Sequence, residues 1–239
     1  MDFDGSRIVG GSLASLGQFP FMGGVLITLT TGGQSVCGSS LISANRALTA
    51  AHCWRTGQFQ GALMTVVLGS LRLFSGGTRV NSNNVRMHEG YNMNTLVNDV
   101  AVVFLPNVVL NNNIRPIALA TGSNQFVGAT VTAAGFGRTG DSWSGQITTS
   151  QQMRHVDLQV ITNQECANVF GSTTVVASTL CVRGPGNRST CGGDSGGPLV
   201  QNNQLVGVTS FGAAAGCERG FPAGFARVTY FYSWINSQM

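Results

Sequence analysis

Short apolar runs separated by turn residues repeat along most of this chain. The clearest are GGVLITL (23–29), MTVVLGS (64–70), DVAVVFL (99–105), GATVTAAGFG (128–137) and QLVGVTSFG (204–212). Valine, threonine and other strand-favouring residues fill these runs, and glycine, asparagine or serine lies near their ends, which is the pattern of strands that end in tight turns. We therefore predict an all-β protein whose strands form barrels.

One stretch near the end of the chain has a different period. In TYFYSWINSQM (229–239), Phe231, Trp234 and Ile235 recur at helical spacing, and Thr229 stands where an N-cap would be. We predict that this stretch is the one well-formed helix and that it packs on the second barrel.

The length of the chain allows two barrels of modest size. It has 239 residues, of which 43% are apolar. No window approaches the ~18 uninterrupted apolar residues of a membrane span. The opening MDFDGSR is acidic, whereas a signal peptide begins basic and becomes apolar. We expect neither a membrane span nor a signal peptide within this sequence.

The six cysteines indicate disulfides and an oxidising compartment. They are Cys37, Cys53, Cys166, Cys181, Cys191 and Cys217, an even number with no CxxC pair and only three histidines in the chain to assist a zinc site. Six cysteines allow fifteen pairings, and their spacing does not choose among them.

The basic residues are unusual because all 13 are arginine. Arginine stays protonated far above the ~10.4 at which lysine titrates, so a strongly alkaline medium is one explanation. Resistance to a protease that cuts at lysine is another, and compositional drift is a third. The net charge is +4, and the arginines are dispersed without interleaved aromatic residues, so we expect no nucleic-acid partner.

Candidate chemistry is concentrated in CGGDSGGPLV (191–200). A serine hydroxyl such as that of Ser195 is a poor nucleophile unless a base removes its proton and nearby donors stabilise the resulting oxyanion. Glycines let backbone amides turn toward one point, so Gly193 and Ser195 could supply two such donors. A glycine-rich turn by itself can also be only a turn, and a base is needed to decide.

His52 and Asp99 supply the missing groups. His52 lies in LTAAHCW (48–54), where a buried structural histidine is the alternative interpretation. Asp99 begins an otherwise apolar strand, and a buried carboxylate is costly unless it is paired. Asp99 holding one imidazole nitrogen while the other faces Ser195 explains all three residues together. His88 and His155 have polar neighbours, and we interpret them as solvated surface groups.

Four motifs in this order resemble those of the trypsin/chymotrypsin family of secreted serine endopeptidases: IVGG (8–11), TAAHC (49–53), NDVAV (98–102) and GDSGGP (193–198). The resemblance covers nearly the whole chain. It implies two six-stranded antiparallel Greek-key barrels and a C-terminal helix, with residues 8–118 in the first barrel and 119–239 in the second. It also implies peptide hydrolysis through an acyl-enzyme, by Ser195 as nucleophile, His52 as base and Asp99 as its partner.

The resemblance further implies the covalent events that shape the enzyme. The disulfides would join Cys37 to Cys53, Cys166 to Cys181 and Cys191 to Cys217. Residues 1–7 would be the remnant of an activation peptide. Cleavage between Arg7 and Ile8 would free an amine that pairs with Asp194. Ser35 stands where many inactive precursors have a histidine that holds this aspartate.

The substrate pocket predicted from the motifs is uncharged. Ser189 forms its floor, where trypsin-like members have an aspartate, Gly212 leaves one wall open, and Ala223 narrows the other by a methyl group. Ser210, Phe211 and Gly212 would pair with the substrate backbone. Large apolar residues should precede the cut, although an elastase-like or collagen-degrading specificity is an alternative. A catalytically silent homologue that acts as a binding module is a rival from another class.

The expected partners follow from this interpretation. They are protein or peptide substrates, an activating trypsin-like protease and protein protease inhibitors. We expect a monomer that is secreted into the extracellular space or the gut lumen. We expect no cofactor and no metal, because residues 69–88, which span the calcium loop of many relatives, contain no acidic side chain.

Overall fold

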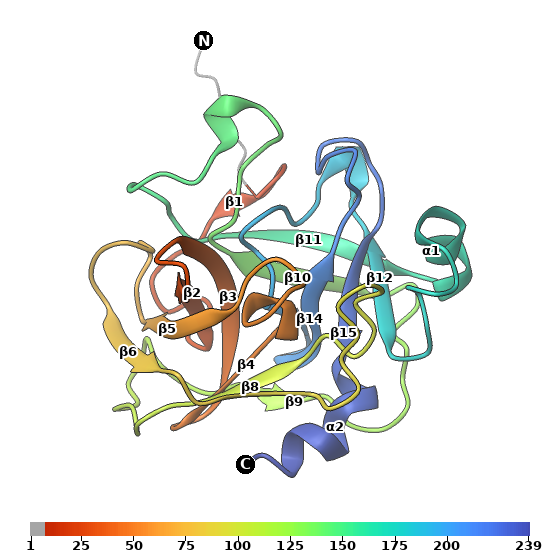
Figure 1. The fold of residues 1–239 in the computed structure, drawn as a ribbon. Coiled ribbons are helices and arrows are strands. Elements are labelled where there is room, and N and C mark those ends of the chain that lie inside the picture. The colour runs from red at the N-terminus through yellow and green to blue at the C-terminus, as the bar shows by residue number, and fades with distance from the viewer. Residues whose placement is uncertain (1–7) are drawn as a thin grey trace.

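The computed structural model describes residues 8–239, and its strands form two curled sheets that pack side by side (Figure 1). The first sheet has seven strands in the order β6-β5-β2-β3-β4-β8-β7. Their bounds are Met22–Leu29 for β2, Gln34–Ser43 for β3, Arg46–Thr49 for β4, Gly61–Leu68 for β5, Thr78–Ser82 for β6, Val85–Met87 for β7 and Ala101–Phe104 for β8.

The seventh strand of this sheet differs from the six that we predicted, and a local bend explains it. The two edge strands, β6 and β7, follow each other in the chain and are separated only by Asn83 and Asn84. At this bend the Ser82 hydroxyl donates to the carbonyl of Phe104 (2.6 Å) and accepts from the amide of Asn84 (3.1 Å). One bent stretch thus pairs first with β5 and then with β8, which curls the sheet toward closure.

The second sheet contains the closed six-stranded barrel that we predicted. Strand β11 pairs with both β10 and β12, which closes the circuit β11-β10-β13-β14-β15-β12. The bounds are Thr130–Gly135 for β10, Arg154–Ile161 for β11, Thr179–Arg183 for β12, Pro198–Gln201 for β13, Gln204–Phe211 for β14 and Ala223–Arg227 for β15. Two short strands extend this sheet: β9 (Ala118–Leu119) pairs with β14, and β1 (Ser12–Leu13) pairs with β11. Ser12 and Leu13 therefore pair with the second sheet, although they fall within the range that we predict for the first barrel.

The apolar runs in the sequence became strands because each buries one or both faces. All five runs overlap a strand, namely β2, β5, β8, β10 and β14. In β11, Val156, Leu158 and Val160 are buried while Asp157 and Gln159 are exposed, which is the alternation of a sheet with one wet face.

The helices require two corrections. The C-terminal helix α2 spans Val228–Asn236 and begins before Thr229, whose hydroxyl instead binds the carbonyl of Asn124 (3.2 Å). It packs on β14, β15 and β9, which confirms its predicted place on the second barrel. A further helix, α1 (Asn163–Phe170), escaped prediction because it is short, although the Thr162 hydroxyl caps it by accepting from the amide of Glu165 (3.1 Å).

A shared apolar core joins the two sheets, and each disulfide links segments of one sheet. The three disulfides Cys37–Cys53, Cys166–Cys181 and Cys191–Cys217 confirm the pairing that the family resemblance implied. One apolar cluster includes Leu48 and Val102 of the first sheet together with Val208 of the second and Phe231 and Ile235 of α2.

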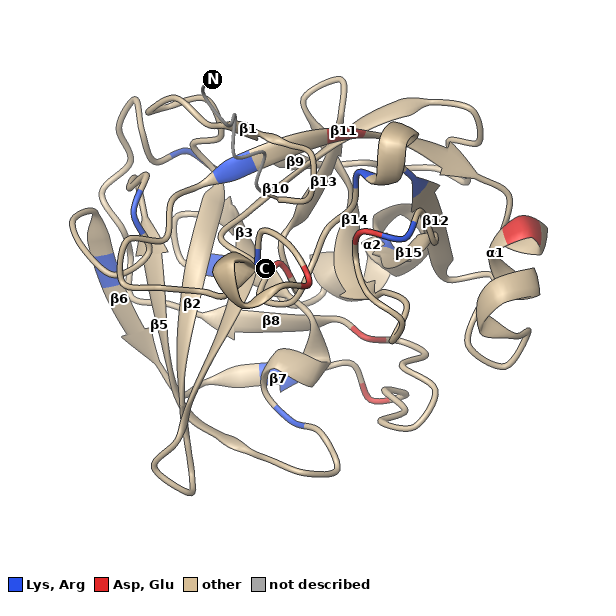
Figure 2. Cartoon of the chain, turned by 90° about the horizontal axis from the view of Figure 1, so that it is seen from above, with Lys and Arg blue, Asp and Glu red and all other residues tan. Residues whose placement is uncertain are grey.

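Figure 2 shows the arginines spread over both sheets, with no side of the molecule carrying most of them. None of the helices in residues 8–239 is long and apolar enough to cross a bilayer.

Candidate active site

His52 and Asp99 are brought together by the pairing of β4 with β8. His52 lies in the 3₁₀ turn Ala51–Cys53, which begins two residues after the end of β4, and Asp99 lies two residues before β8. The register pairs Thr49 with Ala101, so the two flanking residues meet at one end of the sheet. The His52 backbone amide donates to Asp99 Oδ1 (2.8 Å), and its Nδ1 lies 2.7 Å from Asp99 Oδ2. Because Asp99 engages Nδ1–H, Nε2 is left as the basic nitrogen.

Asp99 accepts a third hydrogen bond, from a second residue that the sequence alone did not reveal. Its side chain is only 1% exposed, and Ser210 Oγ donates to Oδ2 at 2.5 Å. The sequence predicts only substrate pairing for Ser210. Three hydrogen bonds, one of them from β14 of the second sheet, offset the cost of burying this carboxylate. The position of Asp99 therefore depends on both sheets.

Ser195 reaches this region because its loop docks on the first sheet. The Ser195 carbonyl accepts from the amide of Gly38 in β3 at 2.7 Å. The next residue, Gly196, packs so closely that a Cβ there would overlap the Thr49 hydroxyl and the amide of Ala50. These contacts fix the serine loop of the second sheet against the turn that holds His52.

Two backbone amides beside Ser195 are available to a ligand. Gly193 has a φ of 95°, a conformation that favours glycine, and a Cβ at this position would lie 3.0 Å from the Cα of Gly137. Within residues 8–239, neither the amide of Gly193 nor that of Ser195 donates to a protein acceptor. Free amides in such a pair can stabilise the negative oxygen of a tetrahedral intermediate.

A cavity of about 210 Å³ opens beside Ser195. Four of the predicted pocket residues line it: Ser189, Ser210, Phe211 and Gly212. Ala223 is not among its lining residues and lies 2% exposed in the core of the second barrel, whereas Phe221 and Pro222 stand at the wall. The sequence analysis did not single out Phe221, because its proximity comes from the fold of the loop after Cys217.

Comparison with known proteins identifies the family of this chain. The family model described as Trypsin matches residues 8–235. The chain belongs to the trypsin family of serine proteases.

Several relatives within this family come from arthropods. The chain is 38% identical over 234 residues to a protein named collagenase from Hypoderma lineatum, and the aligned region covers 96% of this chain and 86% of that protein. It is 39% identical to brachyurin from Leptuca pugilator (97% and 98% covered) and 35% identical to trypsin alpha from Drosophila melanogaster (97% and 87%). A solved structure titled HL collagenase superposes with a TM-score of 0.87 at 36% identity, over 96% of this chain and 97% of that one.

Asp194 stands out among the buried groups of this trypsin-family chain. It accepts hydrogen bonds from the amides of Gly137 (2.8 Å) and Cys191 (2.9 Å) and pairs with no cation of residues 8–239. Burial raises its pKa to about 7, although the two amides oppose this shift. The peptide bond that we predict to be cleaved joins Arg7 to Ile8, and Arg7 lies outside the described residues. Ile8, on the other side of that bond, is 1% exposed.

The pKa of His52 is raised above its ordinary value, which leads to a prediction for the pH dependence. Burial lowers this pKa, but the charge of Asp99 and its hydrogen bond outweigh burial. His52 must be neutral to act as a base, so kcat/KM of the cleaved enzyme should rise with pH and reach half of its plateau above pH 6.5. A profile from about pH 5 to about pH 10 on an uncharged substrate measures this midpoint.

The same profile tests the alkaline interpretation of the lysine-free composition. Arginines keep their charge above ~10.4, so we expect the optimum at or above about pH 8. Asp99→Asn should lower the midpoint of the residual activity, because it removes the charge that raises the pKa of His52. A wild-type midpoint at or below 6.5, the ordinary pKa of histidine, would contradict the raised pKa of His52. An activity optimum below about pH 8 would contradict the alkaline interpretation.

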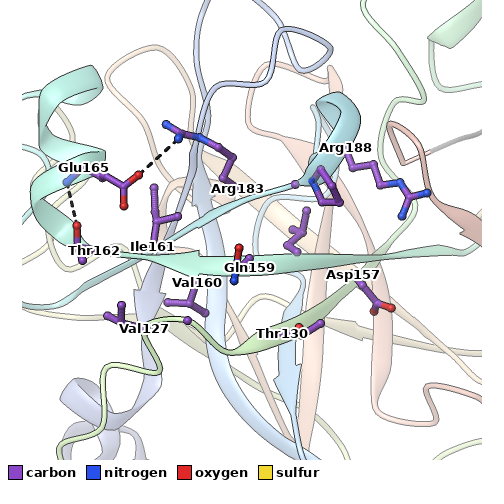
Figure 3. Close-up of a pocket in the computed structure, with 14 residues that line it drawn as sticks. Val127, Thr130, Asp157, Gln159, Val160, Ile161, Thr162, Glu165, Arg183 and Arg188 are labelled. Carbon is purple, nitrogen blue, oxygen red and sulfur yellow. Dashed lines mark hydrogen bonds and ion pairs between the residues drawn. The ribbon is translucent and has the colours of Figure 1, made fainter.

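A larger cavity, of about 680 Å³, lies on the outer side of β11 and contains none of the proposed catalytic residues (Figure 3). Its lining includes Asp157, which accepts from the Thr132 hydroxyl (2.6 Å), and an exposed ion pair between Arg183 and Glu165 (3.5 Å). No histidine or cysteine lines it. We therefore place the chemistry at the smaller cavity beside Ser195.

The other histidines are less solvated than predicted. The ring of His88 packs on Phe231 (5.3 Å between centroids) and Trp234 (5.0 Å), and burial lowers its pKa although Glu89 opposes this. The ring of His155 packs on Phe19 at 5.3 Å. Both are half-buried packing groups, because aromatic residues far away in the sequence cover them.

Two clusters have side chains of the types that bind metals. Cys37 and Cys53 surround His52, and Cys191 and Cys217 surround Asp141. All four sulfurs are in disulfides, which removes the thiolates that a metal would need.

Proposed function

We propose that this chain is a secreted endopeptidase that cuts peptide bonds through an acyl-enzyme at Ser195. The observation that carries the proposal is the buried Asp99–His52 pair beside a serine loop with two unpartnered amides. This arrangement contains the base, the group that orients it and the oxyanion donors that a serine nucleophile requires. The presence of Ser195, His52 and Asp99 also argues against a catalytically silent binding module, because such homologues usually lose one of the three.

Each step of the proposed reaction uses a named atom. Ser195 Oγ attacks the substrate carbonyl carbon while His52 Nε2 takes the hydroxyl proton. The amides of Gly193 and Ser195 hold the oxyanion, and Asp99 stabilises the imidazolium. His52 then gives its proton to the leaving amine as the C–N bond breaks. Water attacks the acyl-enzyme by the same route and restores Ser195.

The uncharged pocket supports a preference for large apolar residues before the cut. Ser189 on the cavity wall offers no counter-charge to a substrate Arg or Lys, and burying an unpaired cation is costly. We expect kcat/KM to be highest for Phe, Tyr, Leu and Met, lower for Ala and Val, and reduced for Trp. A peptide series that varies only this residue measures the preference.

The outcomes of the series separate the alternatives. A preference for Arg or Lys would overturn the pocket assignment, and a preference for Ala over Phe and Leu would favour an elastase-like enzyme. Ala223 is buried in the barrel core and does not line the cavity, so Ala223→Gly should leave the relative Tyr and Trp values unchanged. A selective rise of these two values would show that its methyl does limit the pocket.

Collagen degradation is the second candidate, because the Hypoderma lineatum relative is named collagenase. Incubation with native collagen and with heat-denatured collagen distinguishes the two. Cleavage of only the denatured form favours a general apolar specificity, whereas cleavage of the native triple helix favours the collagen-degrading alternative.

Secretion and a digestive role complete the proposal. The three disulfides support an oxidising compartment. Trypsins are among the relatives, and protein substrates, an activating trypsin-like protease and protein inhibitors are the partners that such a role requires.

A further inference from the structure

An aspartate outside the proposed catalytic machinery binds the rim of the substrate cavity. Asp141 lies in the loop between β10 and β11, just before the 3₁₀ turn Trp143–Gly145. Its Oδ1 accepts from the amide of Cys217 (2.9 Å), and its Oδ2 accepts from the amide of Glu218 (3.1 Å). One carboxylate thus binds two consecutive amides, which are the charge-assisted bonds that hold a loop in one geometry.

The rim is shaped to receive this carboxylate. Gly216, which lines the cavity with Cys217, has a φ of 121°. A Cβ at Gly216 would overlap the Asp141 carboxylate. Glycine is therefore required at this position both for the backbone conformation and for the close approach.

The contact is reciprocal and extends to the opposite side of the cavity. The backbone amide of Asp141 donates to Glu218 Oε2 at 2.7 Å. Earlier in the same loop, the amide of Arg138 donates to the carbonyl of Gly192 at 2.6 Å, next to the oxyanion donor Gly193. The loop thus bridges the same two walls that the Cys191–Cys217 disulfide joins.

We propose that Asp141 is a positioning residue for substrate specificity, which fixes the 216–218 rim so that the cavity keeps the shape that receives the side chain before the cut. Asp141 does not touch the reacting atoms. Its removal should weaken binding of that side chain and leave the nucleophile and base intact. This inference rests on the proposed placement of the substrate in the cavity beside Ser195.

Asp141→Ala in the cleaved enzyme tests the inference. We expect KM for the best substrate of the peptide series to rise about five- to tenfold, because both carboxylate bonds are lost, with kcat within about twofold. Diisopropyl fluorophosphate, which phosphorylates the serine oxygen with loss of fluoride and does not fill the cavity, should inactivate both proteins at the same rate. Asp141→Asn keeps one acceptor, so its KM should fall between the two values.

Asp157→Asn is the matched control, since it makes the same charge change on the outer side of β11, and we expect it to leave KM unchanged. An unchanged KM in Asp141→Ala, or an equal fall of kcat and of the inactivation rate, would overturn the inference. If the wild type prefers Arg or Lys, the proposed function fails instead. That result is separate, because the role of Asp141 is judged from the ratio of KM in the variant to KM in the wild type.

Discussion

Ser195→Ala is expected to lower kcat on peptide substrates by about 10⁴-fold or more while leaving the fold intact. The substitution removes the nucleophile, but the Ser195 carbonyl keeps its bond from Gly38, so the loop should stay docked. His52→Ala should cost a similar factor, and the double variant little more, because the two residues act as one unit. Steady-state kinetics on the cleaved proteins, with circular dichroism to verify folding, measures these effects.

His155→Ala is the control for this experiment, because His155 packs on Phe19 away from the proposed triad. We expect it to keep near-normal kcat. Retention of near-normal peptidase activity by purified Ser195→Ala protein would remove the proposed mechanism.

Cleavage between Arg7 and Ile8 is expected to raise kcat/KM by about 10²-fold or more, because a new α-ammonium would pair with buried Asp194 and hold the two free oxyanion amides beside it in one geometry. In the uncut chain, burial raises the pKa of Asp194 from 3.8 to about 7, so between these pH values the folded protein keeps a proton that the unfolded chain has lost. The free energy of unfolding of the uncut chain should therefore fall as the pH rises through this window. A new α-ammonium would supply the counter-charge. Its own pKa should rise above ~7.7 to 8.0, so this stabilisation is present at lower pH and lost as pH climbs through the raised value.

The backbone of Ile8 supports this second prediction. Its φ is 44°, a conformation that β-branched residues rarely adopt and that costs on the order of 1 to 3 kcal/mol. The torsion φ of Ile8 includes the carbonyl carbon of the preceding residue. Cleavage before Ile8 removes that carbon, and the strain is lost with it.

Activity of the purified uncut protein, measured before and after addition of trypsin, with N-terminal sequencing of the product, tests the activation prediction. Arg7→Gln is the matched control and should stay inactive. An uncharged cavity should not accept Arg7, so we expect no self-activation. Spontaneous cleavage that is second order in the uncut protein and blocked by Ser195→Ala would show that the enzyme activates itself.

Local patterns in the sequence determined much of this protein. The apolar runs located the strands because a short apolar run between turn residues is a property of each segment. The motifs around His52, Asp99 and Ser195 identified the family. The cysteine pairing followed from the family resemblance and not from spacing. The break at Asn83 and Asn84 and the short helix α1 were missed, because their signals are only a few residues long and compete with loop alternatives.

Only the tertiary structure decided how these parts meet. The bond from Ser210 to Asp99 joins residues 111 positions apart, and the bonds from Asp141 to the 217–218 amides span a separation of 76 and 77. The same holds for the aromatic cover of His88 and His155 and for the place of Phe221 at the cavity. Such contacts depend on the packing of two sheets and their loops, and no periodicity in one segment records which distant backbone group will lie beside it.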